Sequence, residues 1–271
     1  MQLTVTTWNI NSVRLRIDLV AKFIKAVRPD VLCLQETKCP DDKFPLKRFK
    51  RLGYEHVALN GQKGYHGVVV LSRLPFESHH IQSFCGKTDC RHVAAVFGAR
   101  AGLARPITLH NFYVPAGGDL PDPAINPKFA HKLSFLDEMR ECAGLRPERS
   151  ERAILVGDLN VAPLEHDVWS HKQMLRVVSH TPIECEKLVT AQQAGGWVDC
   201  MRVLTPEPEK LYTWWSYRAL DWATADRGRR LDHIWTSPAL AGGVASIKIA
   251  KAYRGAARPS DHVPVTATIE V

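Results

Sequence analysis

The chain has 271 residues, of which 24% are charged and 45% are hydrophobic, the balance of a globular protein rather than of a disordered or fibrous one. This length suffices for one large α/β domain or two small ones, and it can bury a sizeable core without a metal or disulfide to hold it together. No apolar run approaches the roughly 20 residues that a helix needs to cross a bilayer. The net charge of +8 favours a polyanionic partner such as nucleic acid, unless it merely keeps the protein in solution.

The first half of the chain predicts strands that alternate with a helix. Residues 3–9 have the pattern of a strand, and residues 14–27 have that of an amphipathic helix. Ser12 would cap the start of this helix. Its apolar face would comprise Leu15, Leu19, Phe23 and Val27. A short buried strand is expected at 30–34, and further strands near 54–59, 67–72, 92–98 and 107–113.

The second half repeats this order. Helices are expected at 128–142 and 184–194, and a buried strand at 153–156. The last strands are expected near 231–236, 246–252 and 263–270. The long irregular stretches, 115–127 and 205–230, are of the kind that often carries function. We expect a single domain over residues 1–271, in which two packed sheets have helices outside.

The cysteines indicate the compartment. There are seven of them at irregular spacing, so no disulfide framework is expected. The start of the chain, residues 1–5, lacks the charged head and apolar core of a secretion signal, which favours a reducing cytoplasm. One region has residue types that suit zinc, but its spacing does not fit a paired pattern, and we interpret it as buried cysteines and surface histidines. These residues are His79, His80, Cys85, Cys90 and His92.

Acidic and amide residues follow the apolar strands, and the first pair is Asp158 with Asn160. In an extended chain, positions i and i+2 point to the same side, so this carboxylate and amide would share a pocket. The carboxylate suits activation of a water, and the amide suits donation to an oxygen that gains charge. The alternative is a turn or a helix cap, which Asp and Asn also favour.

Glu36 ends the apolar strand at 30–34. A buried carboxylate is costly without a partner, so a cation is expected to face it unless Glu36 is an ordinary surface residue. Mg²⁺ favours one or two carboxylates together with waters and a substrate phosphate. Glu36 and Asp261 suit that role.

Asp261 and His262 are adjacent, so in an extended chain their side chains face opposite ways. One could meet a metal and the other a phosphate oxygen, although a lone histidine is often structural. Asp232 begins another strand, and it could hold His262 as a hydrogen-bond donor or form a plain salt bridge. Tyr113 closes the strand 107–113, where its phenol could pack or could bond a phosphate oxygen or the attacking water.

The order of these motifs resembles the exonuclease III family of DNA-repair AP endonucleases, within the endonuclease/exonuclease/phosphatase superfamily. The match runs from about residue 3 to residue 270. Each motif is weak, but eight in one order are specific. They are Trp8-Asn9-Ile10-Asn11, Leu34-Gln35-Glu36-Thr37-Lys38, Gly61-Gln62-Lys63-Gly64, Asn111-Phe112-Tyr113-Val114-Pro115, Gly157-Asp158-Leu159-Asn160, Thr213-Trp214-Trp215-Ser216-Tyr217-Arg218, Arg230-Leu231-Asp232 and Ser260-Asp261-His262-Val263-Pro264.

The resemblance implies a four-layer α/β sandwich of two mostly antiparallel or mixed sheets. It implies a phosphodiesterase that depends on Mg²⁺, or on Mn²⁺ as a substitute. Its partner would be double-stranded DNA, cut 5′ of abasic sites and trimmed 3′→5′ from its ends, with 3′-phosphatase action as a further activity. The enzyme would be a cytoplasmic monomer without a membrane, associated with the nucleoid if the source is bacterial.

Residue roles follow from the same resemblance. The family's metal carboxylate falls on Glu36, and the metal site would also include Asn9, Asn11, Asp158, Asn160, Asp261 and His262. The water-activating residue falls on Asp158, and the amide that steadies the pentacovalent phosphate falls on Asn160. The His–Asp pair falls on His262 and Asp232, and the active-site tyrosine on Tyr113. Whether Asp158 or a Tyr113 phenolate is the base stays open.

DNA contacts are implied as well. The stretch 214–218 resembles a loop that lines a pocket for a base-free sugar, with one of its two tryptophans facing the site. Phosphate contacts, which position DNA without reading sequence, would come from side chains that could equally be solvated. The expected DNA-binding residues are Lys63, Arg91, Trp214, Arg218, Arg229 and Arg230.

Two positions depart from the family pattern. They are Ala116, where relatives often carry Gln or Asn, and Arg229, where several carry Leu or Trp. These departures leave the balance of activities open. Two other functions also remain open at this stage: hydrolysis of a phospholipid or inositol phosphate, and DNA binding by a catalytically dead module.

Overall fold

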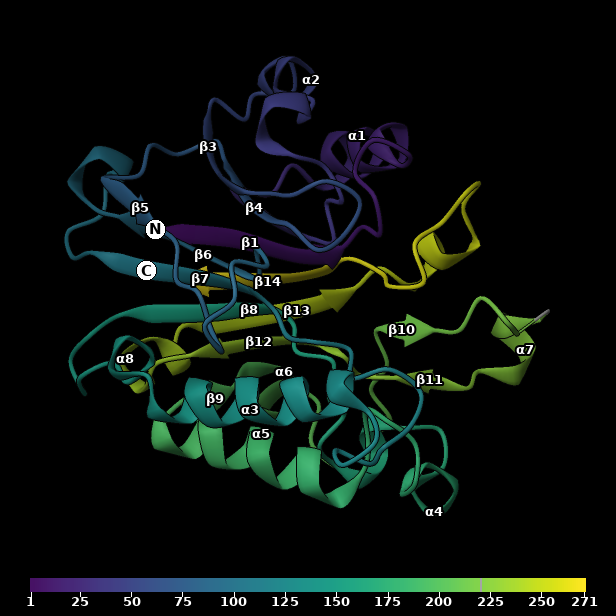
Figure 1. Cartoon of the computed structure of the whole chain (residues 1–271). Coiled ribbons are helices and arrows are strands. Elements are labelled where there is room, and N and C mark those ends of the chain that lie inside the picture. The colour runs from purple at the N-terminus through teal and green to yellow at the C-terminus, as the bar shows by residue number, and fades with distance from the viewer. Residues whose placement is uncertain (220) are drawn as a thin grey trace.

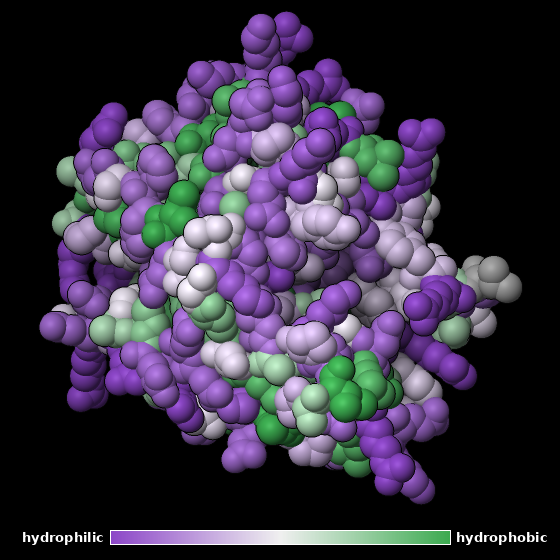
Figure 2. All heavy atoms as spheres, viewed as in Figure 1, coloured by the Kyte–Doolittle hydropathy of each residue, from purple (hydrophilic) through white to green (hydrophobic). Residues whose placement is uncertain are grey.

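The structure, a computed structural model, describes residues 1–219 and 221–271. Two six-stranded sheets pack face to face, and helices cover the outer face of each (Figure 1). The α/β sandwich of four layers, with mixed sheets, is therefore confirmed. Most of the face seen in Figure 2 is hydrophilic, and its apolar side chains form small separate groups.

The first sheet joins the two ends of the chain. Its strand order is β13-β14-β1-β2-β4-β3. β1 runs parallel to β2, and the other neighbours are antiparallel. The strands are β1 (Gln2–Asn9), β2 (Val31–Gln35), β3 (His56–Asn60), β4 (Val68–Ser72), β13 (Val244–Ile249) and β14 (Val265–Glu270).

The second sheet has the order β5-β6-β7-β8-β12-β9. Here β7 and β8 are parallel, and the other neighbours are antiparallel. The strands are β5 (Ser78–His80), β6 (His92–Phe97), β7 (Ile107–Tyr113), β8 (Ala153–Asp158), β9 (Val198–Asp199) and β12 (Asp232–Thr236). A separate two-stranded ribbon pairs β10 (Trp214–Trp215) with β11 (Gly228–Arg229).

The helices are mostly short. In Figure 1, α1 and α2 lie beyond the first sheet, and α3 and α5 beyond the second. The α-helices are α1 (Ile17–Val27), α2 (Leu46–Lys50), α3 (Pro127–Glu141), α4 (His171–Met174), α5 (Pro182–Ala194), α6 (Cys200–Leu204), α7 (Trp222–Ala225) and α8 (Pro238–Ala241). The 3₁₀ turns are Asp41–Lys43, Ala99–Ala101, Ala143–Leu145, Glu165–Asp167 and Lys251–Gly255.

Alternation along β2 explains how one strand serves two cores. Val31 and Cys33 pack between the two sheets. Leu32 and Leu34 point the other way, into the cluster with Phe23 of α1. A strand buried on both faces reads as a continuous apolar run, which is why 30–34 lacks polar residues after Asp30.

α1 differs from the expectation at its start. The helix begins at Ile17, and Ser12 does not cap it, because Ser12 has a φ of +88° and the N-cap residue is Arg16. The expected apolar face is also wrong at its ends, since Leu15 and Val27 are 54% and 43% exposed. The buried side chains are Val20, Ala21, Phe23 and Ile24.

The polar ends of four strands meet at one edge of the sandwich. β1 and β2 end there in parallel, as do β7 and β8. Across the two sheets, Gln35 Nε2 donates to Asn111 Oδ1 (2.7 Å), and this buried bond fixes the relative register of β2 and β7. All seven cysteines are free thiols. Within the described ranges, no helix has the length and apolar character needed to cross a membrane.

Candidate active site

Asn9, at the end of β1, links two acidic residues that come from different sheets. Its Nδ2 donates to Glu36 Oε1 (2.9 Å) and to Asp158 Oδ2 (2.8 Å). Its Oδ1 accepts from the Asn11 backbone N–H (3.0 Å). Every polar atom of this fully buried amide is therefore used, which fixes its orientation.

Asp158 and Asn160 lie together, as expected, but through a turn rather than an extended strand. Asn160 has a φ of +55°, and its backbone N–H bonds Asp158 Oδ1 (3.0 Å). Asn160 Nδ2 donates to Asp158 Oδ2 (3.2 Å) and to the Val114 carbonyl (2.8 Å). Both N–H groups of this amide thus hold Asp158 and the end of β7 in place.

His262 stands between two aspartates. Its Nδ1 lies 2.8 Å from Asp232 Oδ2, and its Nε2 lies 3.5 Å from Asp158 Oδ2. Burial lowers the pKa of His262, but Asp232 and Asp158 outweigh burial and raise that pKa to about 10. At neutral pH the side chain is therefore an imidazolium with a proton on each ring nitrogen, of which the Nδ1 proton is donated to Asp232.

The pKa of Asp158 is raised above that of an ordinary aspartate. Burial raises it, Asp232 adds to the rise, and His262 opposes it, so the pKa lies at about 7. A carboxylate with a pKa near the working pH is suited to proton transfer.

Glu36 and Asp261 flank Asn11 on the more open side of the cluster. Lys38 Nζ lies 2.7 Å from Glu36 Oε2 and donates to Asn11 Oδ1 (2.6 Å). Asn11 Nδ2 lies 3.3 Å from Asp261 Oδ1. Burial raises the pKa of Glu36, but Lys38 outweighs burial and lowers it. Asp261 also has a lowered pKa, because His262 and the Trp214 N–H outweigh its burial.

Tyr113 is buried at the end of β7, with the Arg91 guanidinium 5.0 Å from its ring centre. Burial, and then the charges of Glu36 and Asp158, raise the pKa of Tyr113 well above its ordinary value. The phenol is therefore neutral at physiological pH, so its hydroxyl is able to donate a hydrogen bond.

The donor set suits a hard cation. Oxygen ligands from carboxylates and amides are those that Mg²⁺ prefers, and Glu36, Asp261 and Asn11 offer them on one side of the cluster. Within residues 1–219 and 221–271, the only grouping of His, Cys, Asp and Glu compact enough to hold a metal is Asp158, Asp232 and His262. That grouping includes an imidazole, whereas the Glu36 side offers oxygen ligands alone, which suit Mg²⁺ better.

The expected DNA-binding residues differ in exposure. Lys63 and Arg218 are exposed, and Trp214 and Arg229 are half-buried. Arg91 is 8% exposed and bonds Asp89 and the Tyr113 carbonyl. Arg230 is fully buried, and its three nitrogens bond Asp167 and Asp199. The expectation that Arg230 contacts DNA is wrong, because its guanidinium is buried and hydrogen-bonded to carboxylates inside the protein.

Lys38 and Ser260 belong to the cluster but were not among the expected site residues. The Ser260 hydroxyl donates to the Asn9 carbonyl (2.7 Å), and Lys38 bridges Glu36 and Asn11. Glu36 and Lys38 both have positive φ values, +49° and +50°. The sequence gives no sign of that backbone conformation, because neither residue type favours it.

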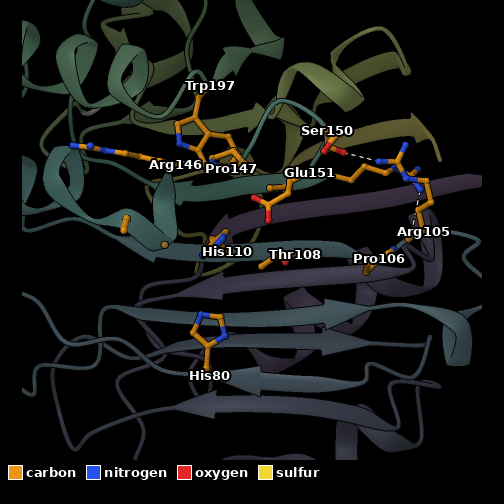
Figure 3. Close-up of a pocket in the computed structure, with 14 residues that line it drawn as sticks. His80, Arg105, Pro106, Thr108, His110, Arg146, Pro147, Ser150, Glu151 and Trp197 are labelled. Carbon is orange, nitrogen blue, oxygen red and sulfur yellow. Dashed lines mark hydrogen bonds between the residues drawn. The ribbon is translucent and has the colours of Figure 1, made fainter.

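A cavity of about 480 Å³ lies at the opposite end of β7. Figure 3 shows Thr108 and His110 of the sheet facing Glu151 across it. Arg105 and Arg152 bond backbone carbonyls beside the cavity. None of the expected site residues lines it, so the strand-end cluster remains the candidate active site.

Comparisons with a family model and with known proteins give consistent results. A model of the Endonuclease/Exonuclease/phosphatase family matches residues 6–262. Exodeoxyribonuclease III of Haemophilus influenzae is 29% identical over 96% of this chain and 97% of its own length. The DNA repair nuclease APEX1 of Danio rerio is 29% identical over 98% of this chain and 82% of its own length.

Solved structures are similar over nearly the whole chain. An AP endonuclease from Archaeoglobus fulgidus has a TM-score of 0.89 at 30% identity, and the match covers 99% of this chain and 100% of that one. A 3′ phosphatase from Neisseria, bound to a product DNA hairpin, has a TM-score of 0.87 at 28% identity, with the same coverage.

Proposed function

The chain belongs to the Endonuclease/Exonuclease/phosphatase family, and we propose that it is a divalent-metal-dependent DNA phosphodiesterase of base-excision repair. It hydrolyses the phosphodiester on the 5′ side of abasic sites and degrades duplex DNA 3′→5′, as an exodeoxyribonuclease III-type enzyme with 3′-phosphatase activity. It acts as a single-domain monomer. Mg²⁺ is the working metal, and Mn²⁺ substitutes for it.

The single observation that carries this proposal is the Asn9 amide, which holds Glu36 and Asp158 together across the two sheets. The same cluster contains the Asp232–His262 ion pair and the buried phenol of Tyr113. A phosphodiester needs a base for water, cations for its oxygens and fixed donors for developing charge. This cluster offers all three, and the names of the relatives above support DNA as the substrate.

Asp158 is the base. Its carboxylate, held by Asn9 and by both nitrogens of Asn160, takes a proton from the attacking water. The raised pKa of the Tyr113 phenol argues against a phenolate in that role. Tyr113 instead donates a hydrogen bond from its neutral hydroxyl to a phosphate oxygen or to the attacking water.

His262 steadies the phosphate. Asp232 holds its Nδ1, which leaves the Nε2 proton available to a phosphate oxygen that gains charge. A divalent cation held by Glu36, Asp261 and Asn11 would neutralise charge on the phosphate and on the leaving 3′-oxygen. Asn160 supports Asp158, since its two N–H groups are already engaged by Asp158 and the Val114 carbonyl.

Duplexes labelled at the 5′ end, with and without one abasic site, test this function when they are incubated with Mg²⁺ beside a lipid phosphodiester. We expect incision 5′ of the abasic site with a 3′-hydroxyl product, and slower shortening of the intact duplex from its 3′ end. Hydrolysis of the lipid alone, or DNA binding without cleavage under Mg²⁺ and Mn²⁺, would reject the proposal.

A further inference from the structure

His66 lies between the two halves of the candidate active site, and it is not among the expected site residues. It belongs to the segment that joins β3 to β4 in the first sheet, and its carbonyl accepts from the Lys38 backbone N–H (2.9 Å). Its ring faces the second sheet, where the ring centre lies 6.0 Å from that of Tyr113. His66 therefore contacts the chain beside Glu36 with its backbone and the surroundings of Tyr113 with its side chain.

The His66 ring accepts a hydrogen bond from a buried arginine. Arg91 Nη2 lies 2.9 Å from His66 Nε2, and because a guanidinium can only donate, Nε2 is the acceptor. Burial, and then the charge of Arg91, lower the pKa of His66 to about 4. The ring is therefore neutral at physiological pH and carries its one proton on Nδ1. That nitrogen lies 3.0 Å from the Gln62 side-chain amide, whose oxygen accepts the proton when it faces the ring.

Arg91 is held at each of its three side-chain nitrogens, and two of its contacts are with Tyr113. Its Nε donates to Asp89, and its Nη1 donates to the Tyr113 carbonyl (3.3 Å). The guanidinium carbon lies 5.0 Å from the centre of the phenol ring. The Arg91 carbonyl also accepts from the Tyr113 backbone N–H (2.8 Å). Arg91 therefore supports both the backbone and the ring of Tyr113.

The bond to His66 is needed to keep the guanidinium in this place. Arg91 is 8% exposed, so water replaces a lost acceptor poorly. A buried donor without a partner is unfavourable, and without the His66 ring the guanidinium would turn toward another acceptor. That turn would withdraw the support of the phenol ring. A hydroxyl group contributes to a reaction only when it is held in the right position.

We propose that His66 is a positioning residue, which holds the Arg91 guanidinium against Tyr113 and so sets the place of the Tyr113 hydroxyl in the phosphodiesterase reaction. This inference rests on the function proposed above. In this role His66 transfers no proton and touches no substrate, so its effect reaches the reaction only through Tyr113. Its removal should therefore lower kcat with little change in KM, and the loss should disappear once the phenol hydroxyl is absent.

A double-mutant cycle tests this role. The kcat and KM of the wild type, His66→Leu, Tyr113→Phe and the double variant are measured on an abasic duplex with Mg²⁺. We expect His66→Leu to lower kcat about threefold to tenfold, no more than Tyr113→Phe does, because it misplaces one hydrogen bond. Its KM should stay within about twofold of the wild type. The double variant should be as fast as Tyr113→Phe alone.

Three further variants complete the design. His66→Gln keeps an acceptor for Arg91, so its kcat should return to within about twofold of the wild type. Exposed His79 of β5 provides the matched control, and His79→Leu should leave kcat unchanged. His66→Asn replaces His66→Leu in the cycle if the latter does not fold. Asparagine suits the positive φ of this position (+50°), and its amide is too short to reach Arg91.

The results separate this role from the function on which it rests. If the losses of His66→Leu and Tyr113→Phe multiply in the double variant, His66 acts independently of Tyr113, and its role is rejected while the phosphodiesterase function stands. A wild-type kcat in both His66→Leu and His66→Asn rejects the role as well. If the wild type cleaves no duplex with Mg²⁺ or Mn²⁺, the proposed function falls and this inference falls with it.

Discussion

Lys132 of α3 and Glu184 of α5 form an ion pair that solvent does not reach. Lys132 Nζ also donates to the Asn160 carbonyl (2.7 Å). The other oxygen of Glu184 accepts from the backbone of Ser179 and Thr181. This pair therefore connects the outer helix layer to Asn160, which supports Asp158.

Glu184→Gln should destabilise the protein by about 3–5 kcal/mol, because it leaves the Lys132 ammonium buried without its counter-charge. The amide oxygen can still accept from Thr181, so the start of α5 is retained. Urea unfolding measures the change. Arg48→Ala, which breaks the exposed pair with Asp18, is the control and should cost less than about 1 kcal/mol. A loss for Glu184→Gln no larger than that of the control would contradict the prediction.

Asp158→Asn should lower turnover on an abasic duplex by at least about 10²–10⁴-fold, the usual contribution of a general base. The amide keeps the size of the side chain and its oxygen can still accept from Asn9, so DNA binding should change little. Its NH₂ then faces the Asn160 backbone N–H, which donates to the carboxylate in the wild type, so a small loss of melting temperature is expected. Steady-state kinetics with Mg²⁺ measure turnover, a filter-binding assay measures DNA binding, and thermal unfolding measures the melting temperature. Near-wild-type cleavage would remove Asp158 from the role of base.

Tyr113→Phe should cost much less, about tenfold in turnover, because a neutral phenol contributes one hydrogen bond and no base. The raised pKa of Tyr113 places its ionisation far above the working range, so the pH profile of the variant should keep the shape of the wild type. Turnover measured from pH 6 to pH 9 checks this. Loss of the acidic limb of the profile in Tyr113→Phe would show that the phenol is the group that must ionise.

Acid should destabilise the fold through histidines that are buried in the neutral form. Burial lowers the pKa of His233 to about 4 and that of His110 to about 3, whereas an unfolded histidine titrates near 6.5. Their contribution to the free energy of unfolding is complete above pH 6.5 and is lost as the pH falls. The reason is that these histidines bind protons in the unfolded chain but not in the folded protein. Each histidine adds a slope of about 1.4 kcal/mol per pH unit.

His233→Asn isolates one of these contributions. Urea unfolding of the wild type and of the variant between pH 6.5 and pH 4.5 gives two slopes, and we expect the variant's slope to be lower by about one proton. Exposed His79 serves as the control, since its replacement by Asn should leave the slope unchanged. Equal slopes for the wild type and His233→Asn would mean that His233 is protonated in the folded protein.

Lys38 should compete with the metal. Its ammonium contacts Glu36 Oε2 and Asn11 Oδ1, two of the atoms that we assign to the cation. Lys38→Met should therefore tighten Mg²⁺ binding, by about fivefold or less because the pair is partly exposed. Thermal unfolding against Mg²⁺ concentration measures the affinity, and Glu36→Gln should abolish the dependence. Weaker binding by Lys38→Met would instead make Lys38 part of the site.

The long elements and the acidic strand ends could be predicted because each has a local signal. The apolar runs at 30–34 and 153–156 are too continuous for an exposed strand, and both are central strands in the structure. The spacing of Asp158 and Asn160 also predicts their pairing, although an extended chain is not what brings them together. Asn160 adopts a positive φ, so the two side chains meet through a turn in which the Asp158 carboxylate accepts from the Asn160 backbone.

The β10–β11 ribbon could not be predicted, although it carries Trp214 and Arg229. Each strand has two residues, which is too short for any periodicity to appear. The buried state of Arg230 was also beyond the sequence. Its partners Asp167 and Asp199 are distant along the chain, and nothing local distinguishes a buried arginine from the exposed Arg227 three positions earlier.

The Asn9 bridge makes turnover a measure of how the two sheets are aligned. Glu36 belongs to the first sheet and Asp158 to the second, so neither layer holds a working centre alone. A slip of one residue along a strand moves a side chain by about 3.3 Å, more than the Asn9 hydrogen bonds tolerate. Substitutions deep between the layers, far from any DNA, should therefore slow the reaction before they reduce the amount of folded protein.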